Sequence, residues 1–267
     1  MKYQLVISDF DKTLGIAPDI IEQETVNAIR KYVEKGGIFA VCTGRMLSGI
    51  RPICLKYGIK GIVASNQGAM INDVETGKSL FCGGIAVEDA AKIAKDISDS
   101  GYVSVAEIDD VMYYQGKSSY VDLYEYCSRI KGKEVSDISE FIVKNGRAVN
   151  KILGFCEPDK TEKAVKSLAE KYKEKLFVNS GAPFLIEAVS VDCSKRFAVN
   201  FLADYYRIPH EKIMTIGDSS NDTELMNGDW YGVAVGDGAE DLKAKAKEVT
   251  VPFDMQPVKF LLEKYCL

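Results

Sequence analysis

Two aspartates, Asp9 and Asp11, come just after the apolar run at residues 5–7, and Thr13 follows two positions later. A buried charge costs several kcal/mol unless it is paired or bound to a metal, so packing is a poor explanation for this pattern. A tight loop after the strand would let one carboxylate act as a nucleophile and the other as an acid or base. The stretch therefore predicts that these residues take part in a chemical reaction.

A second apolar run, residues 213–216, breaks into the sequence GDSSND, which contains Asp218, Asn221 and Asp222. Three acidic or amide groups within five residues make little sense as packing. They do supply the hard oxygen ligands that Mg²⁺ prefers. The pattern predicts a magnesium site at the end of this strand.

Anion-binding groups follow two other elements. Thr43, Gly44 and Arg45 come directly after the apolar run 38–42; glycine lets the backbone approach an anion, and arginine offers a planar fork of donors. Taken alone, this triplet is more often a simple turn. Lys195 opens a helix, where the dipole disfavours cations, so its position indicates a local anion, although a solvated lysine remains the alternative.

The elements that must hold these groups alternate between short apolar runs and amphipathic helices. Runs that are apolar throughout and separated by helices are typical of parallel strands covered on both faces. In a doubly wound sheet the carboxyl ends of such strands meet at one edge, where ligands bind. We therefore expect an α/β protein with a doubly wound, parallel, Rossmann-like core.

An insertion interrupts this core after the linker Gly83-Gly84. Helices are predicted near residues 87–97, 120–129 and 162–172, and the segment 131–143 is left unassigned. Strands are predicted near 102–108, 111–115 and 149–155, with a hairpin from 176–178 and 184–189. The predicted domains are a core made of residues 1–84 and 189–267, and an inserted α/β domain made of residues 85–188.

Composition excludes several classes of function. The 267 residues are 46% apolar, which can fill a sizeable core, and the net charge of −5 argues against nucleic acid or an anionic membrane as a partner. No apolar run approaches the ~18 residues of a membrane span. We expect a cytoplasmic protein that is a monomer or a weak homo-oligomer.

Histidine and cysteine usage narrows the chemistry further. The single histidine, His210, lies in a predicted loop, which disfavours enzymes built on Ser-His-Asp or Cys-His groups. The seven cysteines are scattered and never form a C-x-x-C pair, so we interpret them as reduced thiols that fill the core.

Taken in order, the four motifs resemble those of the haloacid dehalogenase superfamily of phosphohydrolases, Cof-type subfamily IIB. That family has a D-x-D-x-T motif, a Thr or Ser followed by Gly, a lysine, and a G-D-x-x-N-D motif. The resemblance covers essentially the whole chain, including the N-x-G-A segment at residues 66–69. It implies that the insertion is a mixed α/β cap of type C2B.

The resemblance also implies the role of each residue in a phosphatase that acts on a small phosphorylated metabolite. Asp9 would form an aspartyl-phosphate, Asp11 would act as acid and then base, and Mg²⁺ would be the cofactor. The metal ligands would be the Asp9 and Asp218 carboxylates and the Asp11 carbonyl, with Asp222 nearby. The phosphate would contact Thr43, Gly44, Arg45, Lys195 and Asn221.

The chain departs from the family pattern at three places. Lys12 stands where glycine is common, Asp237 where asparagine is usual, and residues 251–254 lack the usual ending. Two other functions stay open: a phosphotransferase such as a phosphomutase, and a non-catalytic regulatory relative. The D-K-T of ion-pumping ATPases also matches residues 11–13, but that register would leave Asp9 unused and would require membrane helices.

Overall fold

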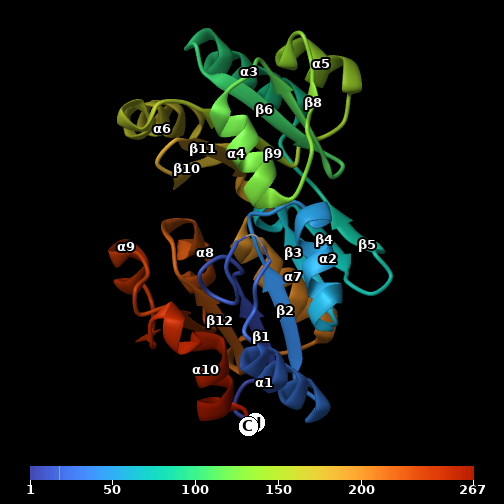
Figure 1. Ribbon diagram of the computed structural model, residues 1–267, viewed down its shortest axis with the longest axis vertical. Coiled ribbons are helices and arrows are strands. Elements are labelled where there is room, and N and C mark those ends of the chain that lie inside the picture. Colours follow the sequence, from blue (N-terminus) through green and yellow to red (C-terminus); the bar gives the residue numbers. More distant parts are fainter. Residues whose placement is uncertain (18) are drawn as a thin grey trace. The chain divides into compact units, whose positions relative to one another are not determined.

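The computed structural model describes residues 1–17 and 19–267 and divides into two compact units (Figure 1). Unit 1 contains Met1–Leu80 and Lys195–Leu267, and unit 2 contains Phe81–Ser194. The boundaries predicted from the sequence, 84/85 and 188/189, lie near these limits. That unit 2 serves as a cap remains a prediction.

Unit 1 is built on an eight-stranded sheet with the order β14-β13-β12-β1-β2-β3-β4-β5. The strands from β14 to β3 are parallel, and β4 runs antiparallel to β3. The parallel core expected from the sequence is therefore confirmed. The bounds are β1 Leu5–Ser8, β2 Ile38–Cys42, β3 Ile62–Ser65, β4 Met70–Asp73, β5 Ser79–Cys82, β12 Ile213–Gly217, β13 Tyr231–Ala234 and β14 Glu248–Val249.

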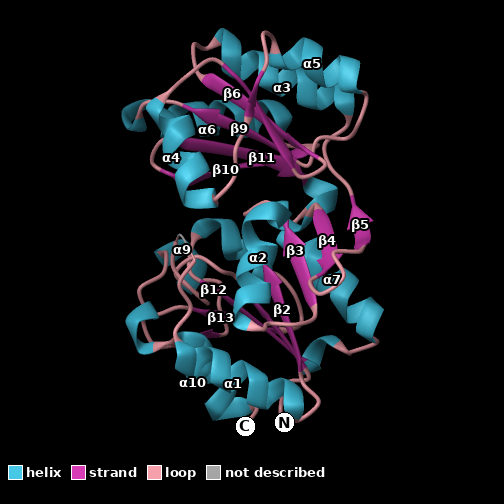
Figure 2. Ribbon diagram, turned by 45° about the vertical axis from the view of Figure 1, so that its right-hand side comes forward, coloured by secondary structure: helices cyan, strands magenta, loops and turns pink. Residues whose placement is uncertain are grey.

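Helices cover both faces of this sheet, which is why every residue of β1 and β12 is buried. Met214 and Ile216 face an apolar cluster that includes α1 and α10, whereas Thr215 faces α8 and its hydroxyl donates to the Leu225 carbonyl. Figures 1 and 2 both show α1 beside α10. The helices are α1 Gln23–Glu34, α2 Leu47–Tyr57, α7 Lys195–Tyr206, α8 Thr223–Met226, α9 Glu240–Lys243 and α10 Pro257–Tyr265.

Unit 2 is a six-stranded sheet in the order β10-β11-β9-β6-β7-β8, antiparallel except for the β7–β8 pair. Residues of α3, α5 and α6 form its apolar cluster with alternate strand residues such as Ala106 and Ile152. Its strands are β6 Val103–Ile108, β7 Val111–Gln115, β8 Lys133–Glu134, β9 Lys151–Phe155, β10 Leu176–Ala182 and β11 Leu185–Ser190. Its helices are α3 Val87–Asp99, α4 Ser119–Ser128, α5 Ile138–Asn145 and α6 Pro158–Tyr172.

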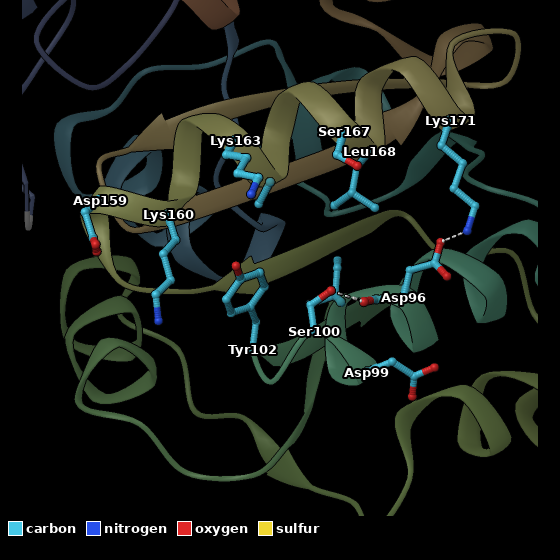
Figure 3. Close-up of a pocket in the computed structure, with 12 residues that line it drawn as sticks. Asp96, Asp99, Ser100, Tyr102, Asp159, Lys160, Lys163, Ser167, Leu168 and Lys171 are labelled. Carbon is cyan, nitrogen blue, oxygen red and sulfur yellow. Dashed lines mark hydrogen bonds and ion pairs between the residues drawn. The ribbon is translucent and has the colours of Figure 1, made fainter.

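A pocket of about 640 Å³ lies in unit 2 between α3 and α6 (Figure 3). Lysine and aspartate side chains line it together, and Lys171 forms an ion pair of 2.6 Å with Asp96. None of the site residues predicted from the sequence lines this pocket. Within the described part of the chain, no helix is both long and apolar enough to cross a membrane.

Candidate active site

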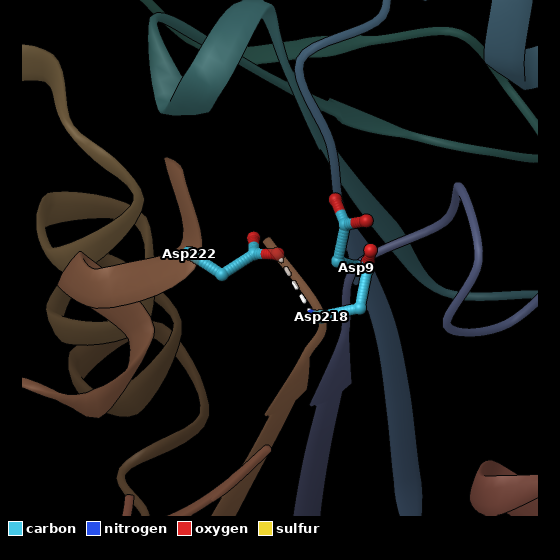
Figure 4. A group of neighbouring side chains, drawn as sticks. All are labelled: Asp9, Asp218 and Asp222. Atoms are coloured by element: carbon cyan, nitrogen blue, oxygen red, sulfur yellow. Dashed lines mark hydrogen bonds between the residues drawn. The ribbon is translucent and has the colours of Figure 1, made fainter. Parts of the chain in front are cut away.

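Three carboxylates meet at the carboxyl edge of the unit 1 sheet (Figure 4). Asp9 follows β1 and Asp218 follows β12, and these strands are parallel neighbours with Ser8 opposite Ile216. Asp222 joins them from the turn after β12. Each offers a carboxylate oxygen, and these oxygens lie within 4.8 Å of one another. Asp9 and Asp222 are buried, so their charges are largely removed from water.

Lys195 is the cation that holds this group together. It is the first residue of α7, its side chain is 1% exposed, and its Nζ lies 2.7 Å from Asp9 Oδ1 and 2.5 Å from Asp222 Oδ1. Burial by itself would lower the pKa of Lys195, but Asp222 and Asp9 raise that pKa well above its ordinary value. The lysine is therefore a fixed positive charge, and the anion that its position indicated is this carboxylate group.

Burial and the repulsion between carboxylates raise the pKa values of Asp9 and Asp218, whereas the charge of Lys195 lowers them. Burial, followed by the charge of Asp222, raises the pKa of Asp9 well above its ordinary value, although Lys195 opposes the shift. The same two causes raise the pKa of Asp218 to about 7, against a hydrogen bond from Thr13. Such shifts mean that a further positive charge would be bound favourably.

Asp222 is engaged mainly with the protein itself. Its Oδ2 accepts the backbone N–H groups of Asp218 at 3.0 Å and Ser219 at 3.1 Å, while its Oδ1 accepts from Lys195. A Cβ on Gly217 would lie 2.6 Å from the Asp222 Cβ, so only glycine permits this close approach. Asp222 therefore orients Asp218 and Lys195, as an outer partner of a metal site does.

Thr13 also belongs to the site, although its place in the first motif did not predict a contact with Asp218. Its hydroxyl donates to Asp218 Oδ1 at 2.8 Å and it is almost fully buried, so it fixes the carboxylate from the other side. The signal was present as the hydroxyl two residues after Asp11. The chain turns sharply here, since the N–H groups of Thr13, Leu14 and Gly15 all point to the Phe10 carbonyl.

Asp11 and Arg45 lie beside this group as a pair of their own. Arg45 donates from Nε to Asp11 Oδ2 at 2.8 Å and from Nη2 to Asp11 Oδ1 at 2.6 Å, and its guanidinium lies 4.6 Å from the Phe10 ring centre. The Arg45 side chain is 7% exposed and that of Asp11 45% exposed. The arginine predicted to contact phosphate thus binds the carboxylate predicted to act as acid.

The remaining predicted residues border the same edge of the sheet. Thr43 follows β2, is buried, and its hydroxyl accepts the Arg45 N–H at 3.2 Å. Gly44 comes next, and a Cβ there would lie 2.7 Å from Gln67 Nε2. Asn221 accepts the Ser219 hydroxyl at 2.6 Å, which ties its amide to the 218–222 turn. Their predicted contacts with phosphate stay predictions.

The donors present fit a hard divalent cation. All three neighbouring groups are carboxylates, with no histidine or cysteine among them, and oxygen-only ligand sets are those that Mg²⁺ and Ca²⁺ prefer. Three ionised carboxylates against one ammonium would leave two negative charges in a buried site. A divalent cation would balance them.

Comparisons with known proteins agree with this geometry. A sequence model of the haloacid dehalogenase-like hydrolases matches residues 6–258. The chain is 26% identical to the 5-amino-6-(5-phospho-D-ribitylamino)uracil phosphatase YwtE of Bacillus subtilis, over 96% of each chain. It is 24% identical to YitU of the same organism, which is named as a phosphatase of the same compound, over 99% of this chain and 98% of that one.

Solved structures show the same fold. A haloacid dehalogenase-like hydrolase from B. subtilis superimposes with a TM-score of 0.86 at 24% identity, covering 97% of this chain and 99% of that one. The subclass IIB sugar phosphatase BT4131 superimposes with a TM-score of 0.85 at 19% identity, covering 98% of both chains. With the family match spanning nearly all of its residues, this chain is a hydrolytic enzyme that belongs to the haloacid dehalogenase-like hydrolases.

Proposed function

We propose that the enzyme is a Mg²⁺-dependent phosphatase that hydrolyses a small phosphorylated metabolite through an aspartyl-phosphate on Asp9. The observation that carries the proposal is the meeting of Asp9, Asp218 and Asp222 around Lys195 at the carboxyl edge of a parallel sheet. That edge is where doubly wound proteins bind their ligands. Hydrolysis of a phosphate ester in this way requires a nucleophile, a positive charge and metal ligands close together, and these residues can supply all three.

The relatives support the class of substrate. YwtE and YitU are named as phosphatases of a phosphorylated ribitylaminouracil, and BT4131 as a sugar phosphatase. All of these substrates are small phosphorylated metabolites. Because these proteins are 26% identical to this chain or less, we propose only this class of substrate for the enzyme, and no particular compound.

Magnesium would be held by the carboxylates of Asp9 and Asp218 and by the backbone carbonyl of Asp11. When bound, it would offset the charge on the transferring phosphoryl group and on the carboxylates. Asp222 would orient these ligands through Lys195 and the two backbone N–H groups that it accepts.

The chain's own residues supply the two chemical steps. In the first, a carboxylate oxygen of Asp9 bonds to phosphorus, the bond from phosphorus to the ester oxygen breaks, and Asp11 gives its proton to the departing alcohol. In the second, Asp11 takes a proton from water, the water oxygen bonds to phosphorus, and Asp9 is released. Lys195 and the Thr43–Arg45 turn would hold the phosphoryl oxygens.

The exposure of Asp11 suits this role. At 45% exposed, its carboxyl group can reach both water and a leaving group. Arg45 fixes its orientation by two hydrogen bonds. For Asp11 to donate a proton, its contact with Arg45 must loosen, since a carboxylic acid cannot accept both bonds as strongly as a carboxylate.

Released phosphate tests the proposal. The purified enzyme is incubated with a panel of sugar phosphates and phosphorylated cofactors, with Mg²⁺, after chelation, and after Mg²⁺ is restored. We expect release with Mg²⁺, none after chelation, and recovery on restoration. Full release by verified metal-free enzyme would contradict the metal assignment. Consumption of an ester without free phosphate would instead identify a phosphotransferase.

A further inference from the structure

The turn Asn66–Gly68 stands out by its backbone. Asn66, Gln67 and Gly68 have φ values of 51°, 59° and 101°, three successive residues in the left-handed region. Asn66 is fully buried and Gln67 is 5% exposed. Glycine and asparagine tolerate this conformation, but glutamine carries its full steric cost. Such strain persists where the surrounding structure holds it in place, and it concentrates at functional sites.

A hairpin alone does not explain Gln67. The turn joins β3 to β4, which pair antiparallel with Ser65 opposite Met70. With Ser65 opposite Met70, the loop consists of the four residues 66–69. A residue with a side chain incurs a steric cost at a positive φ that glycine would avoid. Gln67 incurs this cost, so the contacts of its side chain bear on why glutamine stands there.

The contacts of the turn lead to the predicted phosphate-binding segment. The N–H of Asn66 donates to the Arg45 carbonyl at 2.8 Å, and that of Gln67 donates to the Thr43 carbonyl at 3.0 Å. The Gln67 side chain continues this contact, since its Nε2 would lie 2.7 Å from a Cβ on Gly44. Helix α7, which begins at Lys195, also contacts the turn.

We infer that Gln67 is a positioning residue that holds the Thr43–Arg45 turn in the geometry that receives the phosphoryl group. The inference rests on the proposed function and deepens it by adding a residue that the four motifs do not contain. Gln67 acts through Gly44 rather than on the substrate. Because a displacement of about 1 Å can cost roughly 100-fold in rate, a residue that only supports donors can still be essential.

The test separates a positioning role from a merely structural one. A structural role predicts that phosphate affinity falls together with stability, whereas a positioning role predicts that affinity falls even where stability rises. Gln67→Gly relieves the left-handed strain and keeps the backbone bond to Thr43. We expect its melting temperature to rise by roughly 2–4 °C. Its kcat/KM on a small phosphate ester should fall by roughly 10–100-fold. The dissociation constant of inorganic phosphate with Mg²⁺, measured by calorimetry, should rise in parallel.

Two further variants complete the design. Gln67→Ala keeps the strain and removes the amide, so it should lose phosphate affinity without gaining stability. Arg207→Gly is the matched control: Arg207 also has a positive φ, 55°, but it is exposed at the end of α7. It should gain stability with phosphate affinity and kcat/KM unchanged.

Two results would overturn the inference. One is a Gln67→Gly enzyme that is more stable and keeps wild-type affinity for phosphate. The other is a loss of phosphate affinity that follows a loss of stability through both Gln67 variants. If the wild-type enzyme itself neither bound phosphate nor released it from any ester, the proposed function would fail, whatever the stabilities of the variants.

Discussion

Replacing Lys195 by methionine tests the electrostatics of the site directly. Methionine is similar in length and apolar, so the change removes the ammonium with little loss of volume. It leaves Asp9 and Asp222 as buried carboxylates without the partner that lies 2.7 and 2.5 Å from them. Breaking a buried ion pair from one side costs about 3–5 kcal/mol.

That cost is large compared with the 5–15 kcal/mol that stabilises typical domains. At roughly 2–4 °C per kcal/mol for a domain of this size, the melting temperature of Lys195→Met should fall by roughly 6–20 °C in metal-free buffer. Added Mg²⁺ should then stabilise the variant by more degrees than it stabilises the wild type. The reason is that the metal would enter a site that has lost a repelling cation.

Thermal unfolding with and without Mg²⁺ measures both effects. Lys56→Met is the matched control, because Lys56 also pairs with an aspartate, Asp19 at 3.3 Å, but is 54% exposed. An exposed pair contributes little, so this variant should unfold near the wild-type temperature and respond normally to Mg²⁺. A Lys195→Met protein as stable as wild type without metal, or one that Mg²⁺ stabilises less than it stabilises the wild type, would contradict this expectation.

Three other changes give independent expectations. Asp9→Asn should abolish turnover, and enzyme quenched with acid should carry no phosphoryl group, because an amide is not a nucleophile. Activity within tenfold of wild type, a change of about 1.4 kcal/mol in the barrier, would contradict the assignment of Asp9. Asp11→Asn should slow formation of the aspartyl-phosphate roughly 10²–10⁴-fold on an alkyl phosphate and less on a nitrophenyl phosphate, in single-turnover assays; equal losses would remove its acid role. Burial raises the pKa of Glu107 in the folded protein, although Lys151 opposes the shift. The contribution of Glu107 to the free energy of unfolding is therefore complete below its unfolded pKa of 4.5 and is lost as the pH rises through its folded pKa. Glu107→Gln should flatten that fall in urea midpoints measured against pH, and an unchanged slope would argue against it.

Much of the site could be predicted because parallel strands bring their carboxyl ends together. Once β1 and β12 are parallel neighbours, Asp9 and Asp218 must lie close, and the sequence already placed each at a strand end. The contacts of Arg45 were beyond prediction. Its long side chain can reach a phosphate or a carboxylate equally well, and spacing in the sequence does not say that Asp11 takes both donors.

The unassigned segment 131–143 shows where periodicity fails. It holds β8, two exposed residues with no apolar pattern, and the start of α5. That helix buries only Ile138 and Ile142, too few for a periodic signal, and its N-terminus depends on the cap that Asp137 makes with the Glu140 N–H. Short edge elements of this kind form because neighbours complete them, so a local pattern carries little information about them.

The place of Gln67 in the structure could be predicted only in part. The sequence shows that residues 66–69 resemble a family segment, but it gives no sign that Gln67 adopts a left-handed backbone or lies against Gly44. Both facts depend on strand β4 folding back along β3, which brings the turn to the same edge as Thr43. Residues that carry charge at this edge can be recognised by type and spacing, because few other roles suit buried carboxylates. A residue that positions backbone donors can be of almost any type, so only its conformation and contacts reveal it.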